Sequence, residues 1–137
     1  MMETKLREVL LAEDNPTNQM IFHAYLGKLG ARATVVGSGT AAVRAFARQA
    51  FDVVIMDLQM PVMDGVEAAR KIRAMEAQNG RPRTPIMALT ADTDEDARDD
   101  CLDAGMDAHL VKPATFTAFA EALESLVRKA GKGSQAA

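Results

Sequence analysis

Short apolar runs alternate with helical patterns five times along the chain. The apolar runs predict strands because they are brief, rich in β-branched residues and bounded by turn residues. They are Glu8–Ala12, Ala31–Val36, Val53–Asp57, Pro85–Thr90 and His109–Lys112. After each run, apolar residues recur at the three- and four-residue spacing of a helix. The predicted helices end at Gly30 in the first case and otherwise cover about 40–48, 66–77, 94–104 and 116–129.

This alternation predicts an α/β fold. Right-handed crossovers between consecutive strands give a parallel sheet with helices on both faces. In such sheets, ligands bind outside the carboxyl ends of the strands. The residues that follow each predicted strand are therefore the first place to look for chemistry.

Acidic residues stand at the carboxyl ends of two predicted strands. Val53–Asp57 ends on Asp57, and Glu13 and Asp14 directly follow Glu8–Ala12. Each of them alone also fits a turn, a helix cap before Pro16 or a surface charge. If the first and third strands are neighbours, however, three carboxylates converge, and a hard divalent cation such as Mg²⁺ would relieve their repulsion.

Two further strand ends complete the set. Pro85–Thr90 ends on a hydroxyl, and the fifth strand ends on Lys112, which Pro113 follows. A terminal Thr or Lys is by itself unremarkable as an ordinary strand residue or a surface cation. Together with the carboxylates, they offer what is needed to bind magnesium and a phosphoryl group side by side.

In type and order, these residues resemble the receiver domains of two-component response regulators, over roughly residues 7–128. The resemblance implies a flavodoxin-like, doubly wound (βα)5 fold with strand order 2-1-3-4-5. The segments Glu13–Asn18, Gln59–Gly65 and Ala104–Asp107 are most similar to receivers of hybrid histidine kinases.

The resemblance also implies a role for each site residue. Asp57 is the expected phosphoacceptor. Mg²⁺, with Mn²⁺ as a substitute, is expected on Asp14, Asp57 and the backbone carbonyl of Gln59, with Glu13 acting mainly through water. Lys112 is expected to bind the phosphoryl group, and the peptide bond before Pro113 to be cis.

Further residues are expected to govern the switch. Thr90 senses the phosphoryl group, while Gln59 and Asp92 flank the site and tune the lifetime of that group. His109 stands where many receivers carry Tyr or Phe as a switch residue, so the usual aromatic switch is in question in this chain.

The implied function is that of a signalling switch that promotes its own phosphorylation and dephosphorylation, not that of a turnover enzyme. The expected donor is a histidine kinase or phosphotransfer protein. A downstream partner is expected on the acidic helix, the Lys112 strand and the last helix. The acids at the start of that helix, Asp94, Glu95 and Asp96, also simply complement the helix dipole.

Two alternatives belong to other functional classes. Gly37–Ala42 follows a strand and fits the fingerprint G-x-G-x-x-G/A of a dinucleotide site, with Asp57 about 20 residues further on. This reading explains neither the acidic pair nor Thr90 and Lys112. A phosphatase that works through an aspartyl phosphate would need a second acid at position 59, which is Gln.

Length and composition predict one domain over residues 1–137, with its core at about 7–128 and flexible ends at 1–6 and 130–137. The net charge of -3 argues against nucleic-acid binding. The single cysteine, Cys101, is predicted to be a small core residue. No apolar stretch predicts membrane insertion and the N-terminus lacks a signal-peptide pattern, so we expect a cytoplasmic protein.

Overall fold

The computed structural model describes residues 6–60, 63–91 and 95–136, and it confirms the predicted fold class. Five parallel strands form one sheet in the order β2-β1-β3-β4-β5. The strands are β1 (Glu8–Ala12), β2 (Arg32–Val36), β3 (Val53–Asp57), β4 (Ile86–Thr90) and β5 (Ala108–Val111). The helices are α1 (Pro16–Lys28), α2 (Gly39–Arg48), α3 (Gly65–Asn79), α4 (Glu95–Asp103) and α5 (Phe116–Ala136).

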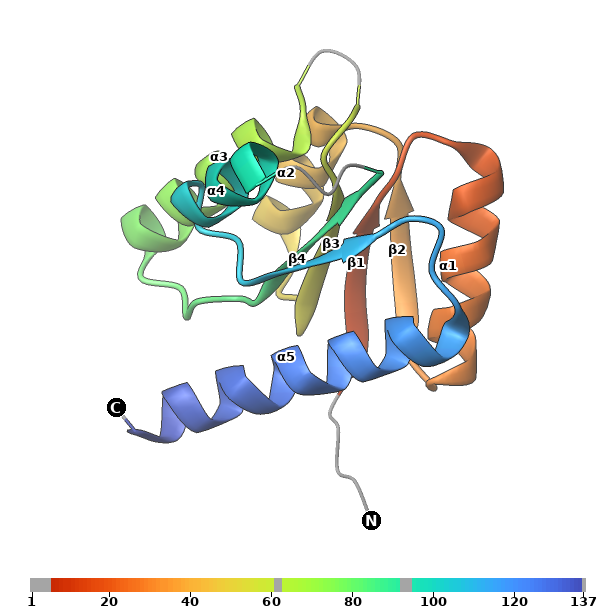
Figure 1. Ribbon diagram of the computed structural model, residues 1–137. Coiled ribbons are helices and arrows are strands. Elements are labelled where there is room, and N and C mark those ends of the chain that lie inside the picture. Colours follow the sequence, from red (N-terminus) through yellow and green to blue (C-terminus); the bar gives the residue numbers. More distant parts are fainter. Residues whose placement is uncertain (1–5, 61–62, 92–94, 137) are drawn as a thin grey trace.

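The helices cover both faces of the sheet. Figure 1 shows α1 and α5 on one side, and α2, α3 and α4 on the other. All residues of β3 and β4 are buried, as expected for central strands covered on two faces. Two apolar clusters form the core, one on each face, and Cys101 is buried in the cluster beneath α2 and α3, as predicted.

The ends of several elements differ from the sequence prediction. Helix α5 continues to Ala136 where the sequence suggested an end at Lys129 and a loose tail. The glycines after Lys129 disfavour helix, but adding turns to an existing helix requires no new nucleation. At the other end, Leu6 was assigned to a flexible segment but is buried in the core.

Some predicted features fall at or beyond the limits of what is described. Strand β5 ends at Val111, one residue before Lys112. The Lys112-Pro113 peptide bond is cis, as expected. Asp92 and the predicted start of the acidic helix at Asp94 lie outside the described residues. None of the described helices combines the length and apolarity required to cross a membrane.

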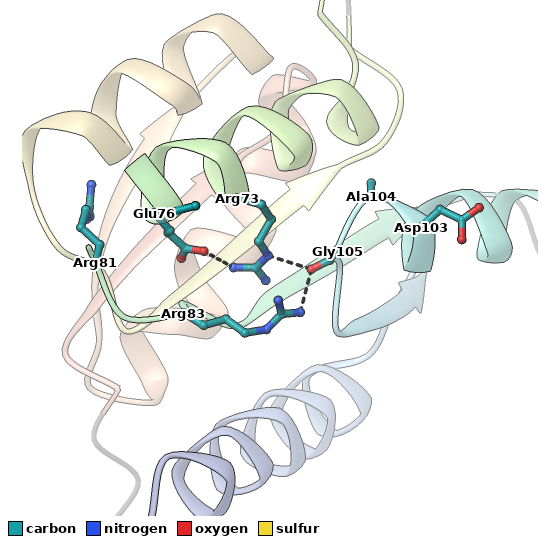
Figure 2. Close-up of a pocket in the computed structure, with 8 residues that line it drawn as sticks. Arg73, Glu76, Arg81, Arg83, Asp103, Ala104 and Gly105 are labelled. Atoms are coloured by element: carbon teal, nitrogen blue, oxygen red, sulfur yellow. Dashed lines mark hydrogen bonds and ion pairs between the residues drawn. The ribbon is translucent and has the colours of Figure 1, made fainter. Parts of the chain in front are cut away.

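A polar network joins the elements at the amino ends of β4 and β5, beside a shallow surface pocket (Figure 2). The Arg73 guanidinium on α3 donates to the carbonyls of Gly105 (3.0 Å) and Thr84 (2.8 Å). It also pairs with the carboxylates of Glu76 (2.8 Å) and Asp107 (2.9 Å).

The two carboxylates of this network have further partners. The backbone N–H of Thr84 donates to Glu76 (2.7 Å), and that of Ile86 donates to Asp107 (2.8 Å). Arg83 adds a second ion pair to Asp107 at 2.7 Å. The network therefore holds α3, the start of β4 and the α4–β5 turn together at the amino ends of the strands.

Candidate functional site

The acidic residues predicted to converge do so at the carboxyl ends of β1 and β3. These two strands are paired, with Ala12 opposite Met56, so Glu13 and Asp57 follow at the same level. Carboxylate oxygens of Glu13, Asp14 and Asp57 all lie within 4.8 Å of one another. Glu13 and Asp57 are buried, whereas Asp14 is exposed.

Lys112 reaches this cluster from the loop after β5. Its Nζ lies 3.2 Å from Oε1 of Glu13 and 3.3 Å from Oδ2 of Asp57. With all groups ionised, three carboxylates and one ammonium leave a net charge of −2 (−3 + 1). The charge of a divalent cation would balance this net charge, and a few carboxylate ligands are typical of protein sites for Mg²⁺.

The electrostatics of Asp57 are set mainly by burial. The pKa of its carboxyl is raised from 3.8 to about 6, mainly by burial and also by the nearby Glu13. The N–H of Gln59, which donates to Oδ1 at 3.1 Å, and the charge of Lys112 act in the opposite direction. Burial therefore makes the charge of Asp57 costly in the absence of a cation.

Glu13 is fixed more firmly than a surface charge would be. Its Oε2 accepts a hydrogen bond from the N–H of Asn15 (3.0 Å). Its carbonyl accepts one from the Gln19 side chain (2.6 Å), and its own N–H donates to the carbonyl of Val36 (3.0 Å). The reading of Glu13 as a solvated charge is wrong for this reason.

At the start of helix α1, the capping residue is Asn15 and not Asp14. Asn15 is the N-cap, with a side chain that accepts from the N–H of Asn18, and Pro16 is the first helical residue. Asn15 thus meets the need for a cap. Asp14 is left exposed at the cluster.

Two glycines bring the neighbouring helices close to the site. A side chain at Gly65 would collide with the backbone of Asp57, and one at Gly39 would collide with the backbone of Met63. Gly39 belongs to the segment that resembled a dinucleotide fingerprint. Its packing role accounts for that glycine without a nucleotide.

The remaining predicted residues lie around the cluster. Thr90 is buried at the end of β4, and its carbonyl accepts from the N–H of Lys112 at 2.7 Å. Gln59 is exposed beside Asp57. His109 is half-buried on β5, which β4 separates from β3, and it lies opposite Ala88 of β4.

Sequence reasoning did not single out two residues that contact this region. Gln19 holds the carbonyl of Glu13, and Tyr25 donates its hydroxyl hydrogen to the carbonyl of Ala114 at 2.8 Å. Tyr25 lies within the helical pattern that follows the first strand, and that pattern does not distinguish it. Neither contact has a signal in the local pattern, because each depends on how α1 packs against other segments.

The family model of the response regulator receiver domain matches residues 9–124. The chain belongs to this family. The Sensor protein GacS of Pseudomonas syringae pv. syringae is 41% identical to the receiver over 112 residues, which are 82% of this chain. The chain spans only 12% of the length of that protein.

Solved structures that are similar to this chain are also receiver domains. The receiver domain of a sensor histidine kinase from Pseudomonas aeruginosa PAO1, with magnesium in its active-site cleft, has 43% identity and a TM-score of 0.80. The match covers 88% of this chain and 97% of that one. The Saccharomyces cerevisiae receiver of Ssk1, crystallised with the histidine phosphotransfer protein Ypd1, has 32% identity and a TM-score of 0.82, with 88% of each chain covered. The expected likeness to receivers of histidine kinases is confirmed.

Proposed function

We propose that this receiver accepts a phosphoryl group on Asp57 from the phosphohistidine of a histidine kinase or phosphotransfer protein. The observation that carries the proposal is the placement of Lys112 between Glu13 and Asp57, in a cluster that retains a charge of −2 (−3 + 1). A similar receiver holds magnesium in its cleft, and another is bound to a phosphotransfer protein. No observation favours the dinucleotide or phosphatase alternative.

The residues of the site divide the chemistry among them. A carboxylate oxygen of Asp57 attacks phosphorus; the new P–O bond replaces the P–N bond to the donor histidine, whose imidazole leaves and takes up a proton. Asp14, Asp57, the Gln59 carbonyl and, through water, Glu13 would hold Mg²⁺. When bound, the ion neutralises charge on the transferring oxygens. Lys112 provides a cation for those oxygens.

The response to phosphorylation involves the neighbouring strands. The added oxygens offer new acceptors to the Thr90 hydroxyl at the end of β4. Movement there shifts the balance between two packings of the surface formed by α4, β5 and α5, where the downstream partner binds. His109 lies on β5 within this surface and is the switch residue of the proposal. Gln59 and Asp92 control the access of hydrolytic water.

Phosphorylation by acetyl phosphate tests the proposal directly. In Mg²⁺, intact-mass spectrometry should show one added phosphoryl group on the wild type and none on Asp57→Asn. Chelation of Mg²⁺ should prevent the reaction. Asp99→Asn, an exposed acid on α4, is the matched control and should react like the wild type. Undiminished phosphorylation of Asp57→Asn would refute the assignment, and NAD binding without Mg²⁺ binding would favour the dinucleotide alternative.

A further inference from the structure

Tyr25 connects helix α1 to the loop that carries Lys112. Its side chain is half-buried, and its hydroxyl donates to the carbonyl oxygen of Ala114 at 2.8 Å. Ala114 lies two residues after Lys112 and 89 positions from Tyr25 in the sequence. The contact therefore joins two segments that only the fold brings together.

The ring of Tyr25 is held by aromatic neighbours. Its centroid lies 5.8 Å from that of Phe22, 5.5 Å from that of Phe116 and 5.3 Å from that of Phe119. Phe22 and Phe119 belong to the buried core on this face of the sheet. With the ring fixed in this way, the hydroxyl is a stable anchor and not a mobile surface group.

Hydrogen bonds bracket Lys112 on both sides. The backbone N–H of Lys112 donates to the carbonyl of Thr90 at 2.7 Å. Two residues further on, the carbonyl of Ala114 accepts from the hydroxyl of Tyr25. Between these two anchors, the Lys112 side chain extends to contact Glu13 and Asp57. A long lysine side chain has many rotamers, so its reach depends on where the backbone is held.

We propose that Tyr25 is a positioning residue for the phosphoryl-transfer site, acting through the Ala114 carbonyl to keep the ammonium of Lys112 at Asp57. The inference rests on the proposed role of Lys112 as the cation that binds the phosphoryl group. Only the N-cap residue Asn15 separates the acidic pair from helix α1, so Tyr25 on this helix links the acidic side of the site to its basic side.

Tyr25→Phe removes the hydroxyl and keeps the ring. It should slow phosphorylation by acetyl phosphate about fivefold, the factor expected for the loss of one ordinary hydrogen bond. Phe51→Leu is the control. It truncates a buried ring of the core cluster on the other face of the sheet. It should therefore lower the melting temperature and leave the phosphorylation rate unchanged.

Affinity for Mg²⁺ separates positioning from general loosening of the fold. Lys112 competes with the cation for Glu13 and Asp57, so releasing it should tighten Mg²⁺ binding in Tyr25→Phe while phosphorylation slows. A merely structural defect would weaken both. The inference is overturned if Tyr25→Phe reacts at the wild-type rate, or if its Mg²⁺ affinity falls together with its rate.

A double-mutant cycle gives a second readout. In a Lys112→Met background, followed over hours by mass spectrometry, Tyr25→Phe should have no further effect on the rate. Equal slowing in both backgrounds would refute action through Lys112. Failure of the wild type to be phosphorylated at all is a different result, since it would refute the proposed function and not the position of Tyr25.

Discussion

At the amino ends of the strands, two arginines face two carboxylates, whereas at the carboxyl ends one lysine faces three. The first group consists of Arg73, Arg83, Glu76 and Asp107, and its charges cancel. The second consists of Lys112, Glu13, Asp14 and Asp57, and it retains a charge of −2 (−3 + 1). Both groups contain buried side chains, so burial alone does not separate them.

The difference lies in how the buried charge is compensated. At the amino ends, guanidinium groups and backbone N–H groups bind the carboxylates of Glu76 and Asp107. At the carboxyl ends, Asp57 pairs with Lys112 and accepts from the N–H of Gln59, and its pKa is still raised to about 6, mainly by burial. A balanced cluster stabilises the fold by itself, whereas an unbalanced one depends on an added cation.

The largest expected effect is at the balanced end. Arg73→Met should lower the free energy of unfolding by about 3 kcal/mol, because it leaves the buried carboxylate of Glu76 without its cation and the half-buried Asp107 with Arg83 alone. Urea denaturation measures this. Arg83→Met is the control: its side chain is 58% exposed, so its loss should cost less than about 1 kcal/mol. Equal losses in the two variants would show that burial of Arg73 is not what matters.

The two clusters of charged side chains also differ in how far the sequence alone predicts them. Asp57, Thr90 and the acidic pair could be predicted to converge because the carboxyl ends of parallel strands meet at one edge. The Arg73 network could not, because Arg73 lies on a helix, where polar residues show no pattern that points to a partner. The burial of Glu13 likewise has no sign in the local pattern, because its contacts with Val36 and Lys112 exist only in the folded chain.

Removing a negative charge from the cluster at the carboxyl ends of the strands should stabilise the metal-free protein. Without metal at pH 8, Asp57→Asn should raise the free energy of unfolding by about 1 kcal/mol, because a buried and only partly compensated charge is lost. Asp14→Asn should give a smaller gain, since Asp14 is exposed. Saturating Mg²⁺ should reverse the order by stabilising the wild type. Destabilisation by Asp57→Asn without metal would mean that Lys112 already compensates its charge.

The gain from Asp57→Asn should depend on pH. The pKa of Asp57 rises from 3.8 to about 6 on folding, so its contribution to stability is fully present below pH 3.8 and is lost as pH rises through 6. Between pH 8 and pH 5, the advantage of the Asn variant should therefore shrink by roughly half. Mg²⁺ affinity should fall over the same range, because protons compete for the carboxylate. An advantage that is constant with pH would place the pKa of Asp57 at its ordinary value.

The smallest expected effect concerns an ion pair at the amino ends that is not buried. Glu8 and Arg32 face each other across β1 and β2 at 3.5 Å, with side chains 32% and 80% exposed. Water screens such a pair, and fixing two long side chains offsets the attraction. Glu8→Gln should therefore change the free energy of unfolding by no more than about 0.3 kcal/mol, in contrast to Arg73→Met. Denaturation in low and high salt measures both variants together. A loss near that of Arg73→Met would show that ion pairing at the amino ends, irrespective of burial, is what stabilises this part of the receiver.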